Sequence, residues 1–382
     1  MSTAAATPES PIQSEDFIFN PYEVIARLRG EDPVHWVPGF GFWWVTRYDD
    51  IRRLLDDPDN ATGDRRAWEF YVAPPEGSFM RWVADHNLFA LSRAEHARVR
   101  RIVSAAFTPR AVARIEGQVR DVITRYAAPL HGRHGVVDLL GEFTNPIPNV
   151  VISRITGVPP AGDDEDRFRE LAQATIQSFL SFGDDELQRR GDSAFIELSD
   201  WVRIMVGERR ETPRDDLLSD LLQAQSAGDT PITDDEIVML VAGLIGAGSE
   251  TTAMGGLVSI ITLLQHPQAW ERLRTDRGLL PKAMSEILRV GFGGPGALPR
   301  YAVRDFELRG KQIRKGQMLM LSFGGANRDP AVYTDPDRLD LDRDPTDLLT
   351  FGHGTHFCLG AHLARQEMRC MLDAVQIGRA HV

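Results

Sequence analysis

The sequence predicts a mainly helical fold with a smaller β-rich portion, and three observations support this prediction. Apolar residues recur at helical spacing over most of the 382 residues, strand-like runs are short, and no internal repeat or linker interrupts the chain. Hydrophobic residues make up 42% and charged residues 26% of the chain, a composition typical of a globular protein with a large core. We therefore expect a disordered leader at residues 1–16 and a single folded domain over residues 17–376.

The expected elements follow from local patterns along the chain. Two short β-type runs flank a glycine-containing turn at residues 39–41, which predicts a hairpin. Residues 57–91 are rich in proline, glycine and aromatic residues without a clean period, so an irregular segment is expected there. A capping box at residues 233–236 starts a long apolar helix that ends before Pro267. Helices are expected at 21–30, 48–56, 94–131 with a break near residue 108, 141–155, 164–182, 184–208, 233–265, 280–290 and 359–375. Strands are expected at 35–37, 42–46, 301–303, 306–308, 312–313 and 318–321, with a Pro/Asp-rich meander at 327–347.

Charge and cysteine usage exclude several classes of protein. Asp and Glu outnumber Lys and Arg by 55 to 43, and the net charge of −12 argues against a general nucleic-acid binder. The two cysteines, Cys358 and Cys370, exclude a disulfide framework and indicate a reducing compartment, which we expect to be the cytoplasm. Cys370 is expected to pack in the core of a helix. Residues 1–12 contain no basic region followed by an apolar core, so no secretory signal is predicted.

The long apolar helix has to be distinguished from a membrane span. Residues 237–264 are largely apolar and exceed about 20 residues, the length that crosses a bilayer. Glu250 stands in the middle of this stretch, and a carboxylate is costly at the centre of a membrane. We therefore predict a helix through a globular core and no association with a membrane.

The segment at residues 351–360 carries the strongest chemical signal. Three of its ten residues are glycines, which allow a tight backbone path. Cys358 precedes an apolar-periodic helix, and a helix N-terminus favours the thiolate form that binds metals. Two alternatives stay open on local evidence: a zinc site that also uses His353, His356 and His362, or a purely structural loop.

The pattern Phe351-x-x-Gly354-x-His356-x-Cys358-x-Gly360 resembles the haem-binding loop of the cytochrome P450 superfamily, the haem-thiolate monooxygenases. The resemblance implies that Cys358 is the proximal iron ligand of haem b, where a thiolate pushes electron density towards the iron. It further implies that Phe351 packs beside the sulfur, that His356 reaches a haem propionate and that Gly360 contacts the cofactor. In the cytochrome P450 fold that it implies, the haem lies between the long helix and this loop.

Two other motifs resemble the same family. Glu286 and Arg289 share a helix face and resemble its Glu-x-x-Arg pair. The family adds an arginine from the meander, here Arg343, and the implied role of the three residues is a structural ion network. Glu250 and Thr251 resemble the family's acid–alcohol pair. The resemblance implies that Thr251 hydrogen-bonds to oxygen at the haem and that Glu250 controls proton delivery.

Further residues are expected to contact the cofactor. His96 and Arg100 lie four apart on one helix face, and an imidazole beside a guanidinium suits carboxylate recognition. They resemble the family's propionate-binding pair, and Arg300 resembles another propionate contact. The same resemblance places Ala247 of the long helix beside the haem.

The helix that carries His96 also begins a basic stripe in this acidic protein. Its members are Arg93, Arg98, Arg101, Arg110 and Arg114. We hypothesise that the stripe docks an acidic electron donor, with salt-dependent steering. A merely solvated helix face is the alternative.

The resemblance implies a soluble bacterial-type monooxygenase. It would use O2 and two electrons, ultimately from NAD(P)H, which a ferredoxin- or flavodoxin-type donor and its reductase would deliver. Six aromatic residues between positions 68 and 89 favour an apolar small organic substrate, to be hydroxylated or epoxidised. Two alternatives are a peroxide-using haem-thiolate enzyme, against which the Glu250–Thr251 pair argues, and a non-catalytic metal-binding scaffold.

The end of the chain departs from the family's pattern. Members of the family continue after the ligand helix with strands that close the substrate pocket. Here the helix is expected to end near Val375, and the last residues do not resemble the family. We therefore expect the domain over residues 17–376 to lack those strands and residues 377–382 to be a non-native tail.

Overall fold

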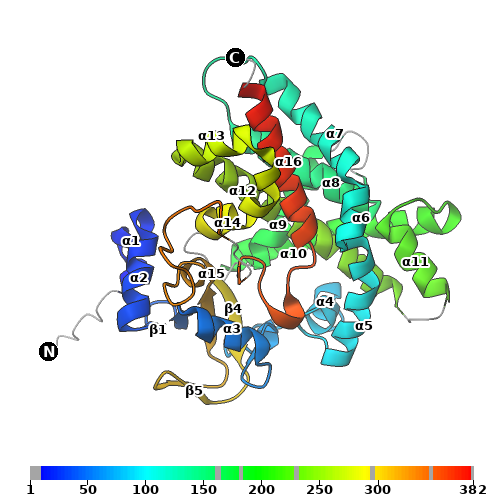
Figure 1. Cartoon of the computed structure of the whole chain (residues 1–382). Helices are drawn as coiled ribbons and strands as arrows, with labels where there is room; N and C mark the ends of the chain where they lie inside the picture. The colour runs from blue at the N-terminus through cyan, green and yellow to red at the C-terminus, as the bar shows by residue number, and fades with distance from the viewer. Residues whose placement is uncertain are drawn as a thin grey trace. The chain divides into compact units, whose positions relative to one another are not determined.

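The computed structural model describes residues 10–159, 165–179, 184–227, 232–292, 297–343 and 347–379. These residues are mostly helical with a small β portion, as predicted (Figure 1). The chain divides into two compact units, each built from segments far apart in the sequence. The first unit contains residues 1–73 and 262–358, and the second unit contains residues 74–261 and 359–382. The expected single domain over residues 17–376 stays a prediction.

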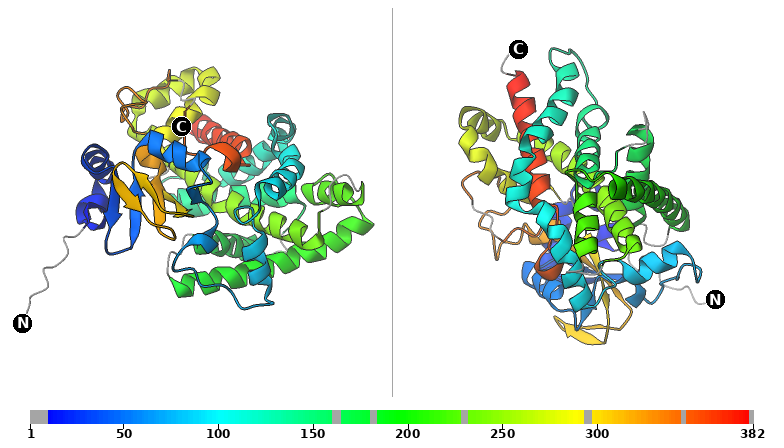
Figure 2. Two further views of the ribbon diagram at one scale, coloured as in Figure 1. Left: turned by 90° about the horizontal axis from the view of Figure 1, so that it is seen from below. Right: turned by 90° about the vertical axis from the view of Figure 1, so that its right-hand side faces the viewer.

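The first unit contains a five-stranded sheet with the strand order β1-β2-β7-β4-β3. β2 and β7 run parallel, and the other neighbours are antiparallel. Figure 2 shows strands from the start of the chain, in blue, beside strands from the later segment, in orange. The five strands are β1 Val34–Val37, β2 Phe42–Val45, β3 Ala61–Thr62, β4 Ala297–Ala302 and β7 Met318–Ser322, and a separate hairpin consists of β5 Phe306–Leu308 and β6 Lys311–Ile313.

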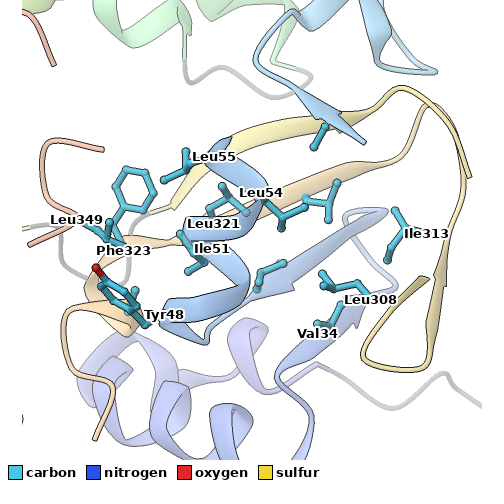
Figure 3. Close-up of a cluster of buried hydrophobic side chains, with 14 of the residues drawn as sticks. Val34, Tyr48, Ile51, Leu54, Leu55, Leu308, Ile313, Leu321, Phe323 and Leu349 are labelled. Carbon is cyan, nitrogen blue, oxygen red and sulfur yellow. The ribbon is translucent and has the colours of Figure 1, made fainter. Parts of the chain in front are cut away.

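An apolar cluster joins helix α3 (Tyr48–Asp56) to this sheet (Figure 3). The buried side chains of α3 recur at helical spacing, with Ile51 and Leu55 on the face that meets Leu321. Leu349 belongs to the same cluster, so the residues that lead into the cysteine loop are packed against the core of the first unit. The other helices of this unit are α1 Glu15–Phe19, α2 Pro21–Glu31, α13 Pro267–Thr275, α14 Leu280–Gly291 and α15 Phe323–Ala326.

The second unit is helical. Leu171 and Ala174 of α9 pack with Ala194 of α10, and Trp201 packs against this group. Its helices are α4 Phe79–His86, α5 Arg93–Ser104, α6 Pro109–Arg114, α7 Glu116–Ala127, α8 Pro146–Thr156, α9 Glu165–Phe179, α10 Asp185–Glu211, α11 Leu217–Ala227 and α16 Ala361–Arg379. Helix α12 (Asp234–Gln265) belongs to this unit up to residue 261.

The predicted leader is wrong for residues 10–16, the part of it that the structure describes. A 3-10 helix at Pro11–Gln13 precedes α1, and Ile12 is buried. Ser10 Oγ lies 2.8 Å from His35 Nε2, and Asp32 Oδ2 lies 2.9 Å from Nδ1 of the same ring. This hydrogen-bonded chain ties the N-terminal segment to the first hairpin, a long-range contact that no local pattern predicts.

Other boundaries also differ from the prediction. The irregular stretch contains helix α4, whose N-terminus is capped by Ser78: the Arg81 N–H donates to Ser78 Oγ at 3.1 Å. Its eight residues are too few for the aromatic side chains to show a helical period. Strand β4 begins at residue 297 instead of 301. Helix α16 begins at residue 361 and continues to residue 379, so residues 377–379 of the expected tail are helical, and residues 380–382 lie outside the described part of the chain.

Helix α12 is the one described helix that is long and apolar enough to cross a membrane, with a mean hydropathy of 1.5 in its most apolar window. However, 61% of that window is buried within the protein. Its burial agrees with the predicted core helix.

Glu286 and Arg289 of α14 form a fully buried ion pair. Arg289 Nε donates to Glu286 Oε2 at 2.7 Å and Nη2 donates to Oε1 at 2.8 Å, and neither side chain is exposed. Arg343 Nε lies 3.2 Å from Glu286 Oε1, as expected for the third member of the network.

The remaining donors of Arg289 are satisfied by backbone carbonyls of the meander. Nη1 donates to the carbonyls of Asn327 and Pro336 at 2.8 and 2.5 Å. Nη2 donates to the carbonyl of Arg338 at 3.1 Å. The pair therefore holds a segment that contains neither helix nor strand in place.

We expect Glu286→Gln to lower the free energy of unfolding by about 3–5 kcal/mol, because it leaves the buried Arg289 without its counter-charge. Urea unfolding followed by circular dichroism measures this change. Glu271→Gln is the matched control, since Glu271 pairs with Arg274 at the same spacing on α13 but on the surface. It should leave the unfolding midpoint unchanged, and equal effects of the two substitutions would contradict the prediction.

Candidate functional site

The cysteine loop of the first unit is closed by its own backbone. Gly352 and Gly354 have φ values of 74° and 67°, which favour glycine. The Cys358 N–H donates to the Phe351 carbonyl at 2.8 Å, and the Phe357 N–H donates to the Gly354 carbonyl at 3.0 Å. Phe351 is buried while Cys358 is exposed, so the loop presents its sulfur at the surface of the first unit.

The two cysteines differ in the way the sequence predicts. Cys370 of α16 is buried, and burial raises the pKa of its thiol to about 11, which suits a core residue. Helix α16 begins three residues after Cys358, so the exposed sulfur precedes the first helical residue.

Arg300 is a buried cation without a carboxylate partner in the described part of the chain. It lies on β4 with 7% of its surface exposed, and its Nη1 donates to the carbonyl of the adjacent Pro299 at 2.9 Å. Burial lowers the pKa of its guanidinium to about 10. A buried charge is costly unless an opposite charge meets it. Arg300 therefore fits an anionic group on a bound cofactor, such as a haem propionate.

The residues predicted to contact the cofactor in the first unit are thus Phe351, His356, Cys358 and Arg300. His356 is half-buried and belongs to the 3-10 turn Gly354–His356 within the loop. The donor set, with one accessible thiol and an unneutralised buried guanidinium, suits a metalloporphyrin with carboxylate substituents.

In the second unit, α12 exposes a stripe on its apolar surface. Ala247, Thr251 and Met254 are exposed, whereas Ser249 and Thr252 are buried. The hydroxyl of Thr251 donates to the Ala247 carbonyl at 2.7 Å. This local bond leaves its oxygen lone pairs available on the exposed face.

Glu250 stands beside this stripe and is half-buried. Its Oε1 lies 3.5 Å from Gln177 Nε2 of α9, at the limit of a hydrogen bond. A carboxylate held this loosely can exchange its partner for water, which is what a group that passes protons requires.

His96 and Arg100 occupy α5 of the second unit. His96 is buried, and burial together with the positive charge of Arg100 lowers the pKa of its imidazole. A depressed pKa keeps the ring neutral at pH 7, with one N–H donor and one acceptor nitrogen. Gly360, predicted to contact the cofactor, also belongs to this unit and precedes α16.

Arg98 is not the exposed surface charge that the hypothesis of a basic docking stripe requires. Its Nη2 donates to Glu236 Oε1, and both side chains are largely buried. Glu236 also completes the capping box of α12 by accepting the Thr233 N–H at 2.8 Å. The partners are 138 residues apart in the sequence, so helical spacing could not reveal the pair.

Zinc ligation is not supported. No group of three or more His, Cys, Asp or Glu side chains in the described ranges is placed to hold a metal ion. One of the proposed zinc ligands, His353, instead places Nε2 at 3.0 Å from Asp56 Oδ2 of α3. Asp56 had no sequence signal, because its contact with the loop depends on the packing of α3.

The sequence and the structure match known proteins over most of the chain. Residues 70–375 match the family model for cytochrome P450. A hydroxylase/epoxidase of mycinamicin IV from Micromonospora griseorubida is 35% identical over 355 residues, which cover 91% of this chain and 85% of that protein. A polyketide biosynthesis cytochrome P450, PksS, from Bacillus subtilis is 31% identical, with 92% of this chain and 87% of that protein covered.

Solved structures agree with these relatives. Epothilone B-bound cytochrome P450epoK superposes with a TM-score of 0.86 at 28% identity, covering 96% of this chain and 91% of that one. P450BioI in complex with an acylated acyl carrier protein gives a TM-score of 0.83 at 28% identity, covering 96% and 93%. The loop pattern, the helical architecture and these matches together show that the chain belongs to the cytochrome P450 family.

Proposed function

We propose that this cytochrome P450 monooxygenase uses O2 and two electrons from a redox partner to hydroxylate or epoxidise an apolar organic molecule. The observation that carries the proposal is the loop in which Cys358 is exposed while its N–H is held by the Phe351 carbonyl. Bound haem b would supply the oxygen activation, assisted by electron donation from a cysteine thiolate.

Residues of the first unit are proposed to hold the haem. Cys358 would ligate the iron, and Phe351 would shield the sulfur from one side. Arg300 would gain the anionic partner that it lacks in the described part of the chain when it meets a haem propionate. His356 would act on the propionates in the same way.

In the second unit, His96, Arg100 and Gly360 are proposed as further haem contacts, with Ala247 forming part of the surface that faces the cofactor. Thr251 would donate a hydrogen bond towards oxygen in the site after releasing the Ala247 carbonyl. Glu250, only loosely held by Gln177, would pass protons from water to this hydroxyl.

The names of relatives and an aromatic cluster support the proposed substrate class. Named relatives include the mycinamicin IV hydroxylase/epoxidase, a cyclomarin C epoxidase and a vitamin D(3) 25-hydroxylase. In this chain, Phe79 stacks on Trp82 and on Phe195, with ring centroids 6.1 and 6.4 Å apart. Both features are compatible with the proposed apolar organic substrate.

Electrons are proposed to come from NAD(P)H through a reductase and a ferredoxin- or flavodoxin-type donor in the cytoplasm. Four members of the basic stripe, Arg93, Arg101, Arg110 and Arg114, are exposed. An acidic donor would be attracted to this surface on a protein of net charge −12.

The first test is spectroscopic. Reduced protein treated with carbon monoxide should show the long-wavelength Soret band of a thiolate-ligated haem, and Cys358→Ser should lose it because a hydroxyl is a poor substitute for a thiolate. Cys370→Ser is the control and should keep the band. Colourless preparations, or a band that survives Cys358→Ser, would defeat the proposal.

A second test concerns proton delivery. Thr251→Ala should lower product formation by about tenfold or more, because the hydroxyl is lost, while the carbon monoxide spectrum stays unchanged. Thr251→Ser keeps the hydroxyl and should retain most of the activity. Turnover driven by hydrogen peroxide alone, at a rate that Thr251→Ala does not lower, would favour the peroxide-using alternative.

A third test concerns the electron donor. Because Arg98 is engaged by Glu236, the charge reversals are placed at Arg101 and Arg110. Arg101→Glu with Arg110→Glu should slow reduction by a ferredoxin about tenfold at low salt, and by less at high salt. Arg154→Glu, an exposed arginine of α8 outside the stripe, is the control. Equal rates for the variant and the wild type at low salt would refute the docking surface.

A further inference from the structure

We propose that Asp56 and His353 form a positioning pair that fixes the cysteine loop of the first unit. This inference rests on the proposed function, because it assigns the pair a role in holding Cys358 where it binds haem. No motif identified in the sequence includes this pair, and the evidence for it lies in the contacts of α3.

Asp56 is the last residue of α3, and its carboxylate meets the loop at two successive residues. Oδ2 lies 3.0 Å from Nε2 of His353. Oδ1 faces Gly354 so closely that a Cβ on this glycine would lie 2.3 Å from it. Gly354 also has a φ of 67°, which favours glycine, and a side chain at this position would displace the Asp56 carboxylate.

The helix that carries Asp56 is anchored to the core of the first unit. Its N-terminal Tyr48 N–H donates to Asp329 Oδ2 at 3.0 Å, and its buried face packs in the apolar cluster through Ile51 and Leu54 (Figure 3). A carboxylate on such a helix has a defined position, and it therefore restricts the position of the loop residues that it contacts.

The start of the loop is already fixed by buried contacts of Asn327. Its Oδ1 accepts the Leu349 N–H at 2.9 Å, and its Nδ2 donates to Thr350 Oγ1 at 3.0 Å. Its backbone carbonyl accepts from Arg289 at 2.8 Å, which links the loop to the buried ion pair. These contacts end at residue 350, before the two glycines of the loop.

The contact of Asp56 with His353 and Gly354 lies further along the loop, within residues 351–358. The glycines make this backbone permissive, and the Cys358 N–H returns to the Phe351 carbonyl across the turn that contains His353. Fixing His353 and Gly354 against α3 fixes the middle of that turn, and with it the direction of the Cys358 sulfur. A ligand must be held within about 0.5 Å of its productive position to bind its metal well.

The experiment compares Asp56→Ala, His353→Ala and the double variant of the full chain. Asp347→Ala is the matched control. Asp347 Oδ1 lies 3.8 Å from Nη1 of Arg52, a residue of α3 like Asp56, and this ion pair is exposed. Two properties are measured. Hydrogen exchange reports the backbone of residues 349–358 whether or not haem is bound. The decay of the long-wavelength Soret band of the reduced carbon monoxide complex reports thiolate ligation.

Each single variant should speed both the exchange of this segment and the spectral decay by about three- to tenfold, the effect of losing one hydrogen bond. The double variant should be no faster than either single variant, because the two side chains act as one pair. Asp56→Asn, which keeps a hydrogen-bonding group, should restore most of the wild-type behaviour. The midpoint of global unfolding should move little in all of them.

Variants that match Asp347→Ala in both measurements would overturn the inference. Effects that add in the double variant would also overturn it, since the residues would then act separately. If exchange accelerates as expected but the wild type has no long-wavelength band, the pair still anchors the loop and the proposed haem function fails. If the wild type has the band and the variants keep it with wild-type decay, the haem function stands and the positioning role fails.

Discussion

The buried guanidinium of Arg289 imposes the strongest constraint on the first unit. A charge with no exposure must be neutralised, and each of its donors needs an acceptor. Glu286 supplies the counter-charge, and carbonyls from the meander supply the remaining acceptors. These contacts, with those that Arg343 makes to the carbonyls of Thr334 and Asp335, hold in place a segment that has no ladder or helix of its own.

The same constraint reaches the cysteine loop through Asn327. Its carbonyl accepts from Arg289, while its side chain holds the two residues that lead into the loop. A polar network of this kind is stabilising only when every member is satisfied. The order of the loop is therefore coupled to the order of a buried ion pair on another element of the same unit.

The residues proposed to bind the cofactor differ from this network in their burial and charge. Arg300 is buried without an anion in the described part of the chain, Cys358 is exposed, and an apolar helix exposes Ala247 and Thr251. Such departures from a fully satisfied core concentrate at binding sites. In the first unit, the exposed thiol of Cys358 and the buried guanidinium of Arg300 suit a cofactor that carries iron and carboxylates better than they suit zinc.

Much of this protein could be predicted from local patterns, because the physics involved is local. Helical spacing predicted the Glu286–Arg289 pair, and the capping box predicted the start of α12. Three glycines with a cysteine predicted the tight loop, and the resemblance of residues 351–360 to a haem-binding loop predicted the family. Only the tertiary structure decided three other contacts. They are the contact of Asp56 with His353, the hydrogen bond between Ser10 and His35, and the ion pair of Arg98 with Glu236. Those contacts join residues far apart in the chain, and no periodicity within one element can specify which distant surface it will meet.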